Sequence, residues 1–411
     1  MDNLDKIMMT RVLLVGGGLT SAVTGALLRR ELPHIELILW DKARGAGGRM
    51  STSRSPYDAT CTADLGAQYI SATPEYAKLH SSYYEELINA GVLIPLSSKV
   101  LGMRTSDEGT KHYVTPNGIS SIVKHFIKEA NVTPKFDHHV RSIDLDNGKW
   151  NVRTLGGEAD FFDAVVLTMP VPQIFGLTGT VKDIIEKDDK LRAGLQSVDY
   201  SSRYALALFF EEDVNVSLED EAAAQYISSD PVLRFVAVDN KKRGLDKMKP
   251  SVVLHTSVPF GKAHVEKTPD QVKPLLINHV KEAFPNWPEP KYVKCQKWRF
   301  SQVTSAYPGL PGYVALADGL IAGGDGFTHS NMDGCIESAK SLAAAVVQIS
   351  FNHLMTAIVM TLHSLEVLNW TPSVKRRTFG KEFGEGREDS DTKSKMLKMA
   401  THPTYLCAST N

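Results

Sequence analysis

The chain of 411 residues has few cysteines and almost no excess of charge of either sign. Its four cysteines are far apart and form no Cys-x-x-Cys pair: Cys61, Cys295, Cys335 and Cys407. This spacing argues against a zinc knuckle and a disulfide framework, and favours reduced thiols in a cytoplasmic protein. We predict no metal site. The formal net charge of −1 argues against a bulk nucleic-acid partner, because such partners bind strongly basic surfaces.

The sequence also shows no secretory signal and no uninterrupted apolar run that could span a membrane. The first apolar run, residues 12–15, belongs to a nucleotide-binding pattern and follows a segment of mixed charge. The apolar stretch 351–368 is interrupted by two histidines and a glutamate, so we expect no transmembrane segment. Residues 371–411 are rich in Lys, Glu, Asp, Ser and Gly, which is typical of disorder. Their function cannot be read from the sequence.

A short apolar strand at residues 12–15 runs directly into Gly16-Gly17-Gly18-Leu19-Thr20-Ser21 and then into a helical pattern. Such glycines let the backbone approach a pyrophosphate, and the helix directs its N-terminal amides at the negative charge. Gly16, Gly18 and Thr20 are therefore candidate phosphate-binding residues, with a plain helix cap as the alternative for Thr20. Ser21 stands where Gly or Ala is usual in this motif.

Three further residues strengthen the dinucleotide prediction. Asp41 follows a second predicted strand, about twenty residues after the glycines, and can accept a hydrogen bond from an adenosine ribose hydroxyl. Gly48 and Arg49 end the run Gly45-Ala46-Gly47-Gly48-Arg49, which puts a guanidinium beside the same phosphates. Together these residues favour FAD over NAD as the bound dinucleotide.

The nucleotide-binding pattern returns far along the chain, with a strand at 320–322, the loop Gly323-Gly324-Asp325-Gly326 and a helix at 334–348. We therefore predict an α/β fold with two domains (an α+β flavoprotein). Its Rossmann domain is discontinuous and comprises 8–75, 115–175 and 315–350. A substrate domain on an antiparallel sheet comprises 76–114 and 176–314, and a C-terminal extension comprises 351–411.

Local patterns predict several elements within these domains. Helical spacing covers 74–91, starting at Thr73 as a cap, and 118–130. A hairpin joins 139–145 to 150–153 through Asp146-Asn147-Gly148. The run Lys241-Lys242-Arg243 either meets phosphates or forms a solvated turn.

Several long segments resemble the renalase family, a group of FAD-dependent, amine-oxidase-like flavoproteins. The resemblance covers about residues 11–347 and is carried by 41–43, 47–50, 61–70, 167–172, 200–206, 239–243, 294–299, 323–328 and 333–335. It implies a glutathione-reductase-type Rossmann domain that binds FAD non-covalently, and a substrate domain on an antiparallel sheet.

The resemblance also implies an activity. The expected reaction oxidises dihydronicotinamide dinucleotides reduced at ring position 2 or 6 to β-NAD(P)⁺, while O₂ becomes hydrogen peroxide. Two alternatives stay open: a monoamine oxidase acting on catecholamines, and a non-catalytic binding or signalling protein that keeps a nucleotide fold. The preference between NAD and NADP isomers and the oligomeric state cannot be read from the sequence.

The resemblance assigns further cofactor contacts to Gln68 and Tyr69 at the flavin ring and to Val140 at the adenine. Gly324 and Asp325 follow a buried strand, which places the carboxylate near the ribityl chain. Asp333 and Gly334 open the last predicted helix, whose N-terminal dipole can stabilise negative charge at the flavin's N1–C2=O edge. Core packing is the alternative for Tyr69 and Val140, and helix capping for Asp325, Asp333 and Gly334.

Four residues are candidates for the catalytic site. Trp298 can wall off the substrate ring, and Arg234 and Arg299 can meet carboxamide or phosphate oxygens. His255 is the fourth, with a satisfied core histidine as the alternative.

Overall fold

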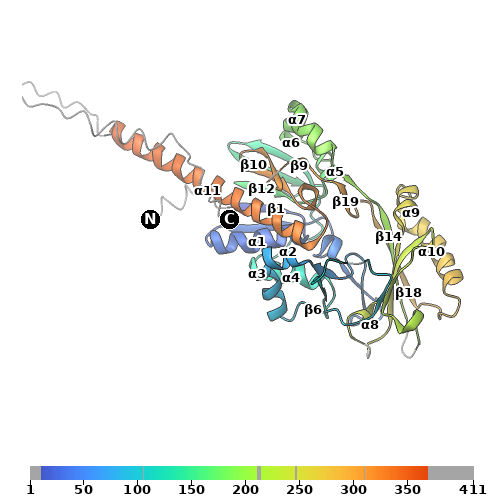
Figure 1. Cartoon of the computed structure of the whole chain (residues 1–411). Helices are drawn as coiled ribbons and strands as arrows, with labels where there is room; N and C mark the ends of the chain where they lie inside the picture. The colour runs from blue at the N-terminus through green and yellow to red at the C-terminus, as the bar shows by residue number, and fades with distance from the viewer. Residues whose placement is uncertain (1–10, 105, 211–213, 246–247, 310, 369–411) are drawn as a thin grey trace, which may run out of the picture. The chain divides into compact units, whose positions relative to one another are not determined.

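The computed structural model describes residues 11–104, 106–210, 214–245, 248–309 and 311–368 (Figure 1). Residues 1–359 form one compact unit, and residues 360–411 form a second. Both large sheets lie in the first unit.

A five-stranded sheet holds the nucleotide-binding pattern, in the order β2-β1-β12-β21-β20. Its strands are β1 (Arg11–Val15), β2 (Glu36–Trp40), β12 (Ala164–Leu167), β20 (Tyr313–Ala317) and β21 (Leu320–Gly323). The first four strands in this order are parallel, and β20 pairs antiparallel at the edge. Strands as far apart in sequence as β1 and β21 thus form one sheet, and the predicted α/β fold class is confirmed.

Each face of this sheet has its own core. Val12 and Leu14 pack with α1 (Leu19–Glu31), α4 (Ser120–Glu129) and the start of α11 (Met332–Leu368) (Figure 1). Leu13 and Val15 point to the other face, as alternation along a strand requires. That face packs against the sheet β11-β10-β9 and three short helices, whose bounds are β9 (Val140–Asp146), β10 (Lys149–Thr154), β11 (Ala159–Phe162), α5 (Val171–Ile174), α6 (Thr180–Lys187) and α7 (Asp189–Gln196).

The predicted hairpin is confirmed. β9 and β10 pair antiparallel, and Asn147 and Gly148 both have positive φ, at 49° and 78°. Two successive left-handed residues are what a two-residue hairpin turn needs.

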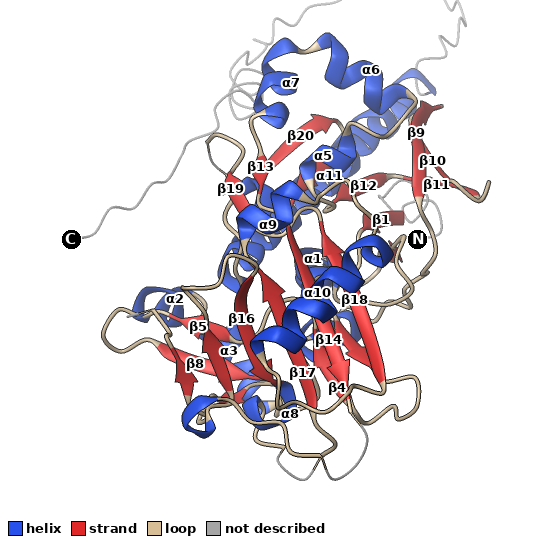
Figure 2. Cartoon of the chain, turned by 90° about the vertical axis from the view of Figure 1, so that its right-hand side faces the viewer, coloured by secondary structure: helices blue, strands red, loops and turns tan. Residues whose placement is uncertain are grey.

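The second large sheet is six-stranded and mainly antiparallel, in the order β18-β14-β17-β16-β15-β7. Its strands are β7 (Val100–Leu101), β14 (Arg203–Phe209), β15 (Ala224–Tyr226), β16 (Leu233–Val238), β17 (Ser251–Thr256) and β18 (Tyr292–Trp298). One face packs against α10 (Pro269–Ala283), which crosses β14 and β18 (Figure 2). The opposite face packs against β4 (Thr62–Asp64) and Leu65. We name this opposite face the inner face of the sheet.

Short elements connect the two sheets. They are β3 (Thr52–Arg54), β5 (Ile70–Ala72), α2 (Pro74–Leu79), α3 (Ser81–Asn89), β6 (Ile94–Pro95), β8 (Lys111–Val114), β13 (Asp199–Tyr200), α8 (Asp239–Lys242), α9 (Val258–Ala263) and β19 (Val303–Ser305), with 3₁₀ turns at Gly48–Met50, Glu219–Glu221 and Asp325–Phe327.

The predicted helix over 74–91 is interrupted at His80. Thr73 caps α2 as expected, since its side chain accepts a hydrogen bond from the Tyr76 amide. Tyr83, Tyr84 and Leu87 of α3 pack in the core beside α1, α4 and α11, although the prediction placed this segment in the substrate domain. The exact domain boundaries stay a prediction, because both sheets belong to one compact unit.

The prediction that the last helix ends near residue 348 is wrong. α11 continues to Leu368, because residues 349–368 contain neither glycine nor proline and therefore no helix-breaking residue. The disorder predicted for 371–411 lies outside the described residues. Among the helices that the structure describes, none combines the length and the apolar character that crossing a membrane requires.

A chain ending at Val359 should keep the stability of the first unit. Residues 360–411 belong to the other unit, so we expect their removal to shift the thermal midpoint by less than about 2 °C. A chain ending at Ser341 is the control, because it loses the fully buried Leu342 and Val346 and should unfold at a clearly lower temperature. Equal losses in both truncations would contradict the prediction.

Candidate functional site

The loop between β1 and α1 leaves room for a ligand beside its glycines. Gly16 has a φ of +121°, and a Cβ there would meet Thr168 Oγ1 at 2.6 Å. A Cβ on Gly18 would meet no atom within 4 Å, so it would project into open space. Gly48 lies across from Gly18, since a Cβ on Gly48 would be 3.5 Å from the Gly18 Cα. A hydrogen bond of 2.8 Å from the Gly47 amide to the Gly17 carbonyl joins the two loops.

The side chains at this loop are held in place. Asp41 accepts hydrogen bonds from the amides of Gly17 and Ala43. The Ser21 hydroxyl, unusual in this motif, is accommodated by a hydrogen bond of 2.8 Å with Thr168 Oγ1. Thr20 is buried at the start of α1.

The segment that leads into Val140 lies beside Asp41. The Asp41 amide donates to the Lys135 carbonyl at 3.0 Å, and the His138 amide donates to the Asp41 carbonyl at 2.9 Å. Val140 itself is buried at the first position of β9, which fits both an adenine neighbour and ordinary core.

Arg49 and Asp325 form a bidentate ion pair, although they are 276 positions apart in the sequence. The Nη1–Oδ2 and Nη2–Oδ1 distances are 2.6 and 2.5 Å, and the side chains are 29% and 6% exposed. Burial opposes the charge of Arg49, but the charge and hydrogen bonds of Asp325 raise the pKa of Arg49 above its ordinary value. The pair joins the two ends of the discontinuous nucleotide-binding pattern.

These residues fit FAD. The open space beside Gly18 is bordered by backbone amides at the start of α1 and by the loop that carries Arg49, which are donors suited to a pyrophosphate. The Asp41 carboxylate at the end of β2 suits a ribose hydroxyl. Gly324, with a φ of +122°, precedes Asp325 and donates its amide to Ser338 Oγ at 2.7 Å.

The loop from Leu65 to Tyr69 lies against the inner face of the six-stranded sheet. The Leu65 carbonyl accepts hydrogen bonds from Trp298 Nε1 at 2.9 Å and from His255 Nε2 at 3.0 Å. Gln68 accepts from Lys242 Nζ at 2.8 Å, and Tyr69 shares a hydrogen bond of 2.6 Å with the Tyr226 hydroxyl. The structure thus brings together four of the predicted residues: Gln68, Tyr69, His255 and Trp298.

His255 is neutral at neutral pH in this setting. Burial, with the positive charge of Arg203 as a smaller cause, lowers the pKa of His255 to about 4. A neutral ring can donate through Nε2 to the Leu65 carbonyl, so His255 holds the loop without carrying a charge.

Four charged residues form a buried charge cluster below this loop: Asp64, Asp239, Lys242 and Arg243. Lys242 Nζ lies 2.7 Å from Asp239 Oδ1, and both side chains are 0% exposed. Arg243 pairs with the other Asp239 oxygen at 2.5 Å. Burial and the nearby Asp239 raise the pKa of Asp64 to about 6. The solvated turn considered for 241–243 is therefore wrong for Lys242 and Arg243.

Arg234 lies near this region together with Arg203, for which the sequence predicted no role. Arg203 Nη1 donates to the Thr256 carbonyl at 3.0 Å, and Arg234 Nη1 donates to the Ile227 carbonyl at 3.1 Å. We name these two residues the arginine pair.

Arg299 does not join this group. Its guanidinium pairs with Glu266 at 2.9 and 2.7 Å and also donates to the Val265 carbonyl. Lys297 donates to the same Val265 carbonyl, so Lys297 and Arg299 share a side, and Trp298 between them points to the inner face. We therefore place Arg299 outside the candidate site.

At the start of α11, Asp333 forms hydrogen bonds with other side chains and Gly334 packs closely against the backbone. The buried Asp333 carboxylate accepts from Tyr84 at 2.8 Å and contacts His80 Nδ1 at 2.9 Å. A Cβ on Gly334 would lie 2.2 Å from the His329 carbonyl oxygen, so only glycine fits. These contacts favour a structural role for both residues, while the effect of the helix N-terminus on a flavin stays a prediction.

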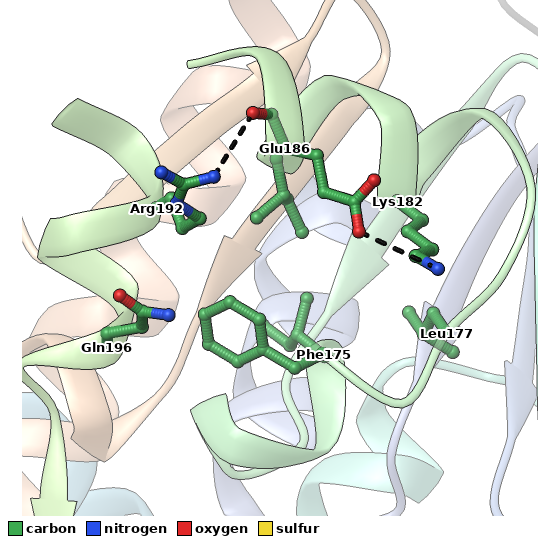
Figure 3. A pocket seen from close by; sticks show the side chains of 8 residues that line it. Phe175, Leu177, Lys182, Glu186, Arg192 and Gln196 are labelled. Carbon is green, nitrogen blue, oxygen red and sulfur yellow. Dashed lines mark hydrogen bonds and ion pairs between the residues drawn. The ribbon is translucent and has the colours of Figure 1, made fainter. Parts of the chain in front are cut away.

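A cavity of about 360 Å³ lies elsewhere, among α5, α6 and α7 (Figure 3). Apolar side chains such as Phe175 and Leu177 line it, and its charged residues already pair, Lys182 with Glu186 and Arg192 with the Glu186 carbonyl (Figure 3). None of the predicted site residues lines this cavity.

Comparisons with known proteins agree with this geometry. Residues 14–87 match the family of NAD(P)-binding Rossmann-like domains, and residues 85–347 match the flavin containing amine oxidoreductases. Renalase from Mus musculus is 44% identical over 339 residues, which cover 81% of this chain and 98% of the mouse protein.

Solved structures share the fold at low identity. A protein from Exiguobacterium assigned as a protoporphyrinogen oxidase has a TM-score of 0.61 at 13% identity, and putrescine oxidase bound to putrescine has 0.58 at 11%. Each comparison covers 82% of this chain and 99% of the other.

The predicted resemblance is confirmed by these matches, and so is FAD as the cofactor. The chain is therefore a member of the renalase family within the flavin-containing amine oxidoreductases, and it is an FAD-dependent oxidoreductase.

Proposed function

We propose that the protein is an oxidase of 2- and 6-dihydro-NAD(P). The donor loses a hydride and becomes β-NAD(P)⁺, while O₂ takes up that hydride equivalent and one proton to give hydrogen peroxide. When bound, FAD supplies the hydride acceptor and the route of the electrons to O₂. Because the nicotinamide ring becomes aromatic as it loses the hydride, the protein's task is to hold the ring in place.

The observation that supports this donor is the sign of charge around Trp298 and His255. The arginine pair is positive, and the nearby carboxylates of the buried charge cluster are already matched by Lys242 and Arg243. An amine substrate is a cation at neutral pH and gains nothing from such surroundings. A dinucleotide brings an aromatic ring and negative phosphates, which suit both features.

Neutral His255 supports the same reading. An amine must lose a proton before or during its oxidation, which favours a basic group near its nitrogen. The low pKa of His255 and its hydrogen bond to the Leu65 carbonyl make it a poor base. Hydride loss from a dihydronicotinamide needs no such group.

The deciding experiment is anaerobic rapid mixing of the FAD-loaded protein with 2- and 6-dihydro-NAD(P), followed through the flavin absorbance. We expect fast bleaching, one β-NAD(P)⁺ formed per flavin, and hydrogen peroxide after oxygen is admitted. Catecholamines in a parallel mixture should leave the flavin oxidised. Bleaching by catecholamines alone would support the monoamine oxidase alternative and reject our proposal.

Replacement of Trp298 by alanine should slow flavin reduction about 100-fold while FAD stays bound. The Trp298 ring is fixed by its hydrogen bond to Leu65, and a substrate displaced by about 1 Å loses on the order of 100-fold in rate. Single-turnover reduction of the FAD-saturated variant measures the effect.

Trp287 provides a matched control, because it packs on Phe284 at the α10 side of the same sheet and donates to the Ser217 carbonyl. Trp287→Ala should lower the thermal midpoint and leave the reduction rate constant unchanged. An unchanged rate constant in Trp298→Ala would count against a substrate role.

We further propose that the protein binds FAD non-covalently and that it is located in the cytoplasm. Burial raises the pKa of the Cys335 thiol to about 12, and a protonated thiol is a poor nucleophile for attachment. Cys61, Cys295 and Cys335 are free thiols in the part of the chain that the structure describes, which supports a reducing compartment.

A further inference from the structure

We propose that Arg203 and Arg234 form an anion subsite that binds the phosphate groups of the dinucleotide substrate. This inference rests on the proposed function, and it identifies the phosphates as the part of the substrate that the two arginines bind.

The sheet register brings the two arginines to one end of the candidate site. Arg203 is the first residue of β14 and lies directly opposite Trp298 on β18. Its guanidinium donates to the carbonyl of Thr256, the residue after His255. Thr256 in turn pairs with Leu233, the neighbour of Arg234. One arginine therefore comes from each side of the strand that carries His255.

A bulge sets the position of Arg234. The pairing of β16 with β17 shifts between Leu233 and Phe235, so that Arg234 is the extra residue. A bulge re-aims a side chain relative to regular alternation, and bulges are frequent next to active sites. The Ile227 carbonyl then fixes one guanidinium nitrogen of Arg234, which leaves the remaining donors available.

Within the described chain neither guanidinium forms an ion pair with a carboxylate, and this distinguishes the pair from Arg49 and Arg243. Arg49 and Arg243 each hold an aspartate at close range. Arg203 instead has Arg234 near it: burial first, and the positive charge of Arg234 second, lower the pKa of Arg203. Two like charges in a partly buried place are unfavourable unless an anion joins them.

The chemistry of the donors selects the ligand. A guanidinium is a planar fork that matches two phosphate oxygens at once and stays charged at all physiological pH. With Trp298 and His255 beside the arginine pair, a ligand can place an aromatic ring at the former and a phosphate at the latter. A dinucleotide has both groups, whereas the neutral carboxamide of its nicotinamide ring would not balance two positive charges.

The test compares a substrate with and without phosphates. Dihydronicotinamide riboside carries the same reacting ring as the dinucleotide but no phosphate. In Arg203→Met and in Arg234→Met we expect KM for the dinucleotide to rise about 10- to 100-fold, as for the loss of a charge-assisted hydrogen bond. KM for the riboside should change less than about threefold, and the rate constant of flavin reduction should stay close to that of the unmodified enzyme.

Arg299→Met is the matched control, because this arginine is paired with Glu266 away from the site and its loss should leave both KM values unchanged. Arg203→Lys should recover part of the dinucleotide affinity, since it restores the charge without the fork. If Arg203→Met fails to fold, Arg203→Lys and Arg234→Met carry the comparison.

Calorimetric binding of inorganic pyrophosphate to the FAD-loaded protein gives a readout independent of turnover. We expect binding to the unmodified protein and a loss of at least about tenfold in each methionine variant. Unchanged pyrophosphate binding in the variants, or equal losses for dinucleotide and riboside, would overturn the subsite. If no dihydronicotinamide reduces the flavin, the proposed function fails, and the pyrophosphate measurement still decides the subsite.

Discussion

Arg49→Ala should raise the Kd for FAD by roughly 30- to 150-fold, which corresponds to the loss of about 2–3 kcal/mol from a charge-assisted contact. The guanidinium lies on the loop joined to the phosphate-binding glycines and is held in a fixed direction by Asp325. Its removal takes away a positive charge from the place predicted for the pyrophosphate. Quenching of FAD fluorescence on titration with the apo-protein measures the constant.

The same substitution should also destabilise the apo-protein, because it leaves the Asp325 carboxylate, 6% exposed, without its charged partner and with only the Ser330 hydroxyl as a side-chain donor. Adding Asp325→Asn to Arg49→Ala removes this uncompensated charge, so the double variant should recover stability but not FAD affinity. A Kd within twofold of the unmodified protein in Arg49→Ala would reject the phosphate role. Recovery of both properties in the double variant would mean that the arginine acts only through Asp325.

Lys242→Met should cost about 3–5 kcal/mol of unfolding free energy, the range observed when one partner of a buried ion pair is removed. Lys242 is fully buried, bonds both Asp239 and Gln68, and links the buried charge cluster to the loop above it. Its loss leaves Asp239 with one cation and leaves Gln68 Oε1 without its donor. Denaturant unfolding of the FAD-loaded protein measures the change.

The neighbouring Lys241 is the control for this prediction. Its ammonium lies 3.6 Å from the exposed Glu221, so Lys241→Met should change stability by no more than about 0.5 kcal/mol. Lys242→Met combined with Asp239→Asn should lose less than the sum of the two single variants, because the unpaired charge is removed. Similar stabilities of Lys241→Met and Lys242→Met would show that the buried cluster does not act as a unit.

The sequence predicted those parts of the molecule that depend on local backbone geometry. The glycine loop, the Asn147-Gly148 turn and the Thr73 cap require particular residue types at particular positions, so these features can be recognised in the sequence. The return of the nucleotide-binding pattern at residues 320–323 was also readable, since a buried strand, a glycine loop and a helix follow one another there.

The sequence predicts less about which face of the six-stranded sheet each side chain points to. Trp298 and Arg299 are neighbours in sequence, yet successive residues of an extended segment face opposite sides, and only the pairing partners show which side is inner. Arg203 stood in a segment used for the resemblance, but nothing local marks an arginine as lacking an acidic partner. That property depends on every residue that folds around it.

Contacts between residues far apart in sequence also determine the surroundings of Asp333 and Lys242. Asp333 looked available at the start of a helix, but His80 and Tyr84, about 250 residues earlier, occupy its carboxylate. Lys242 looked like part of a solvated turn, because three successive cations rarely become buried. Asp64 and Asp239 provide the compensating charge, and their proximity to Lys242 is a property of the fold alone.

The distance along the chain between Arg49 and Asp325 has a consequence for synthesis on the ribosome. At about 5–20 residues per second, the 276 residues between them take roughly 15–55 s to be made. During that time β1, β2 and β12 have no β21 beside them, and the first helix and α4 lack the packing of α11. A nascent chain in this state exposes an unpaired strand edge and apolar surface, which makes it a client for chaperones. Cofactor capture should therefore follow the synthesis of β21 and Asp325, and flavin supply should affect the yield of the finished protein more than its rate of translation.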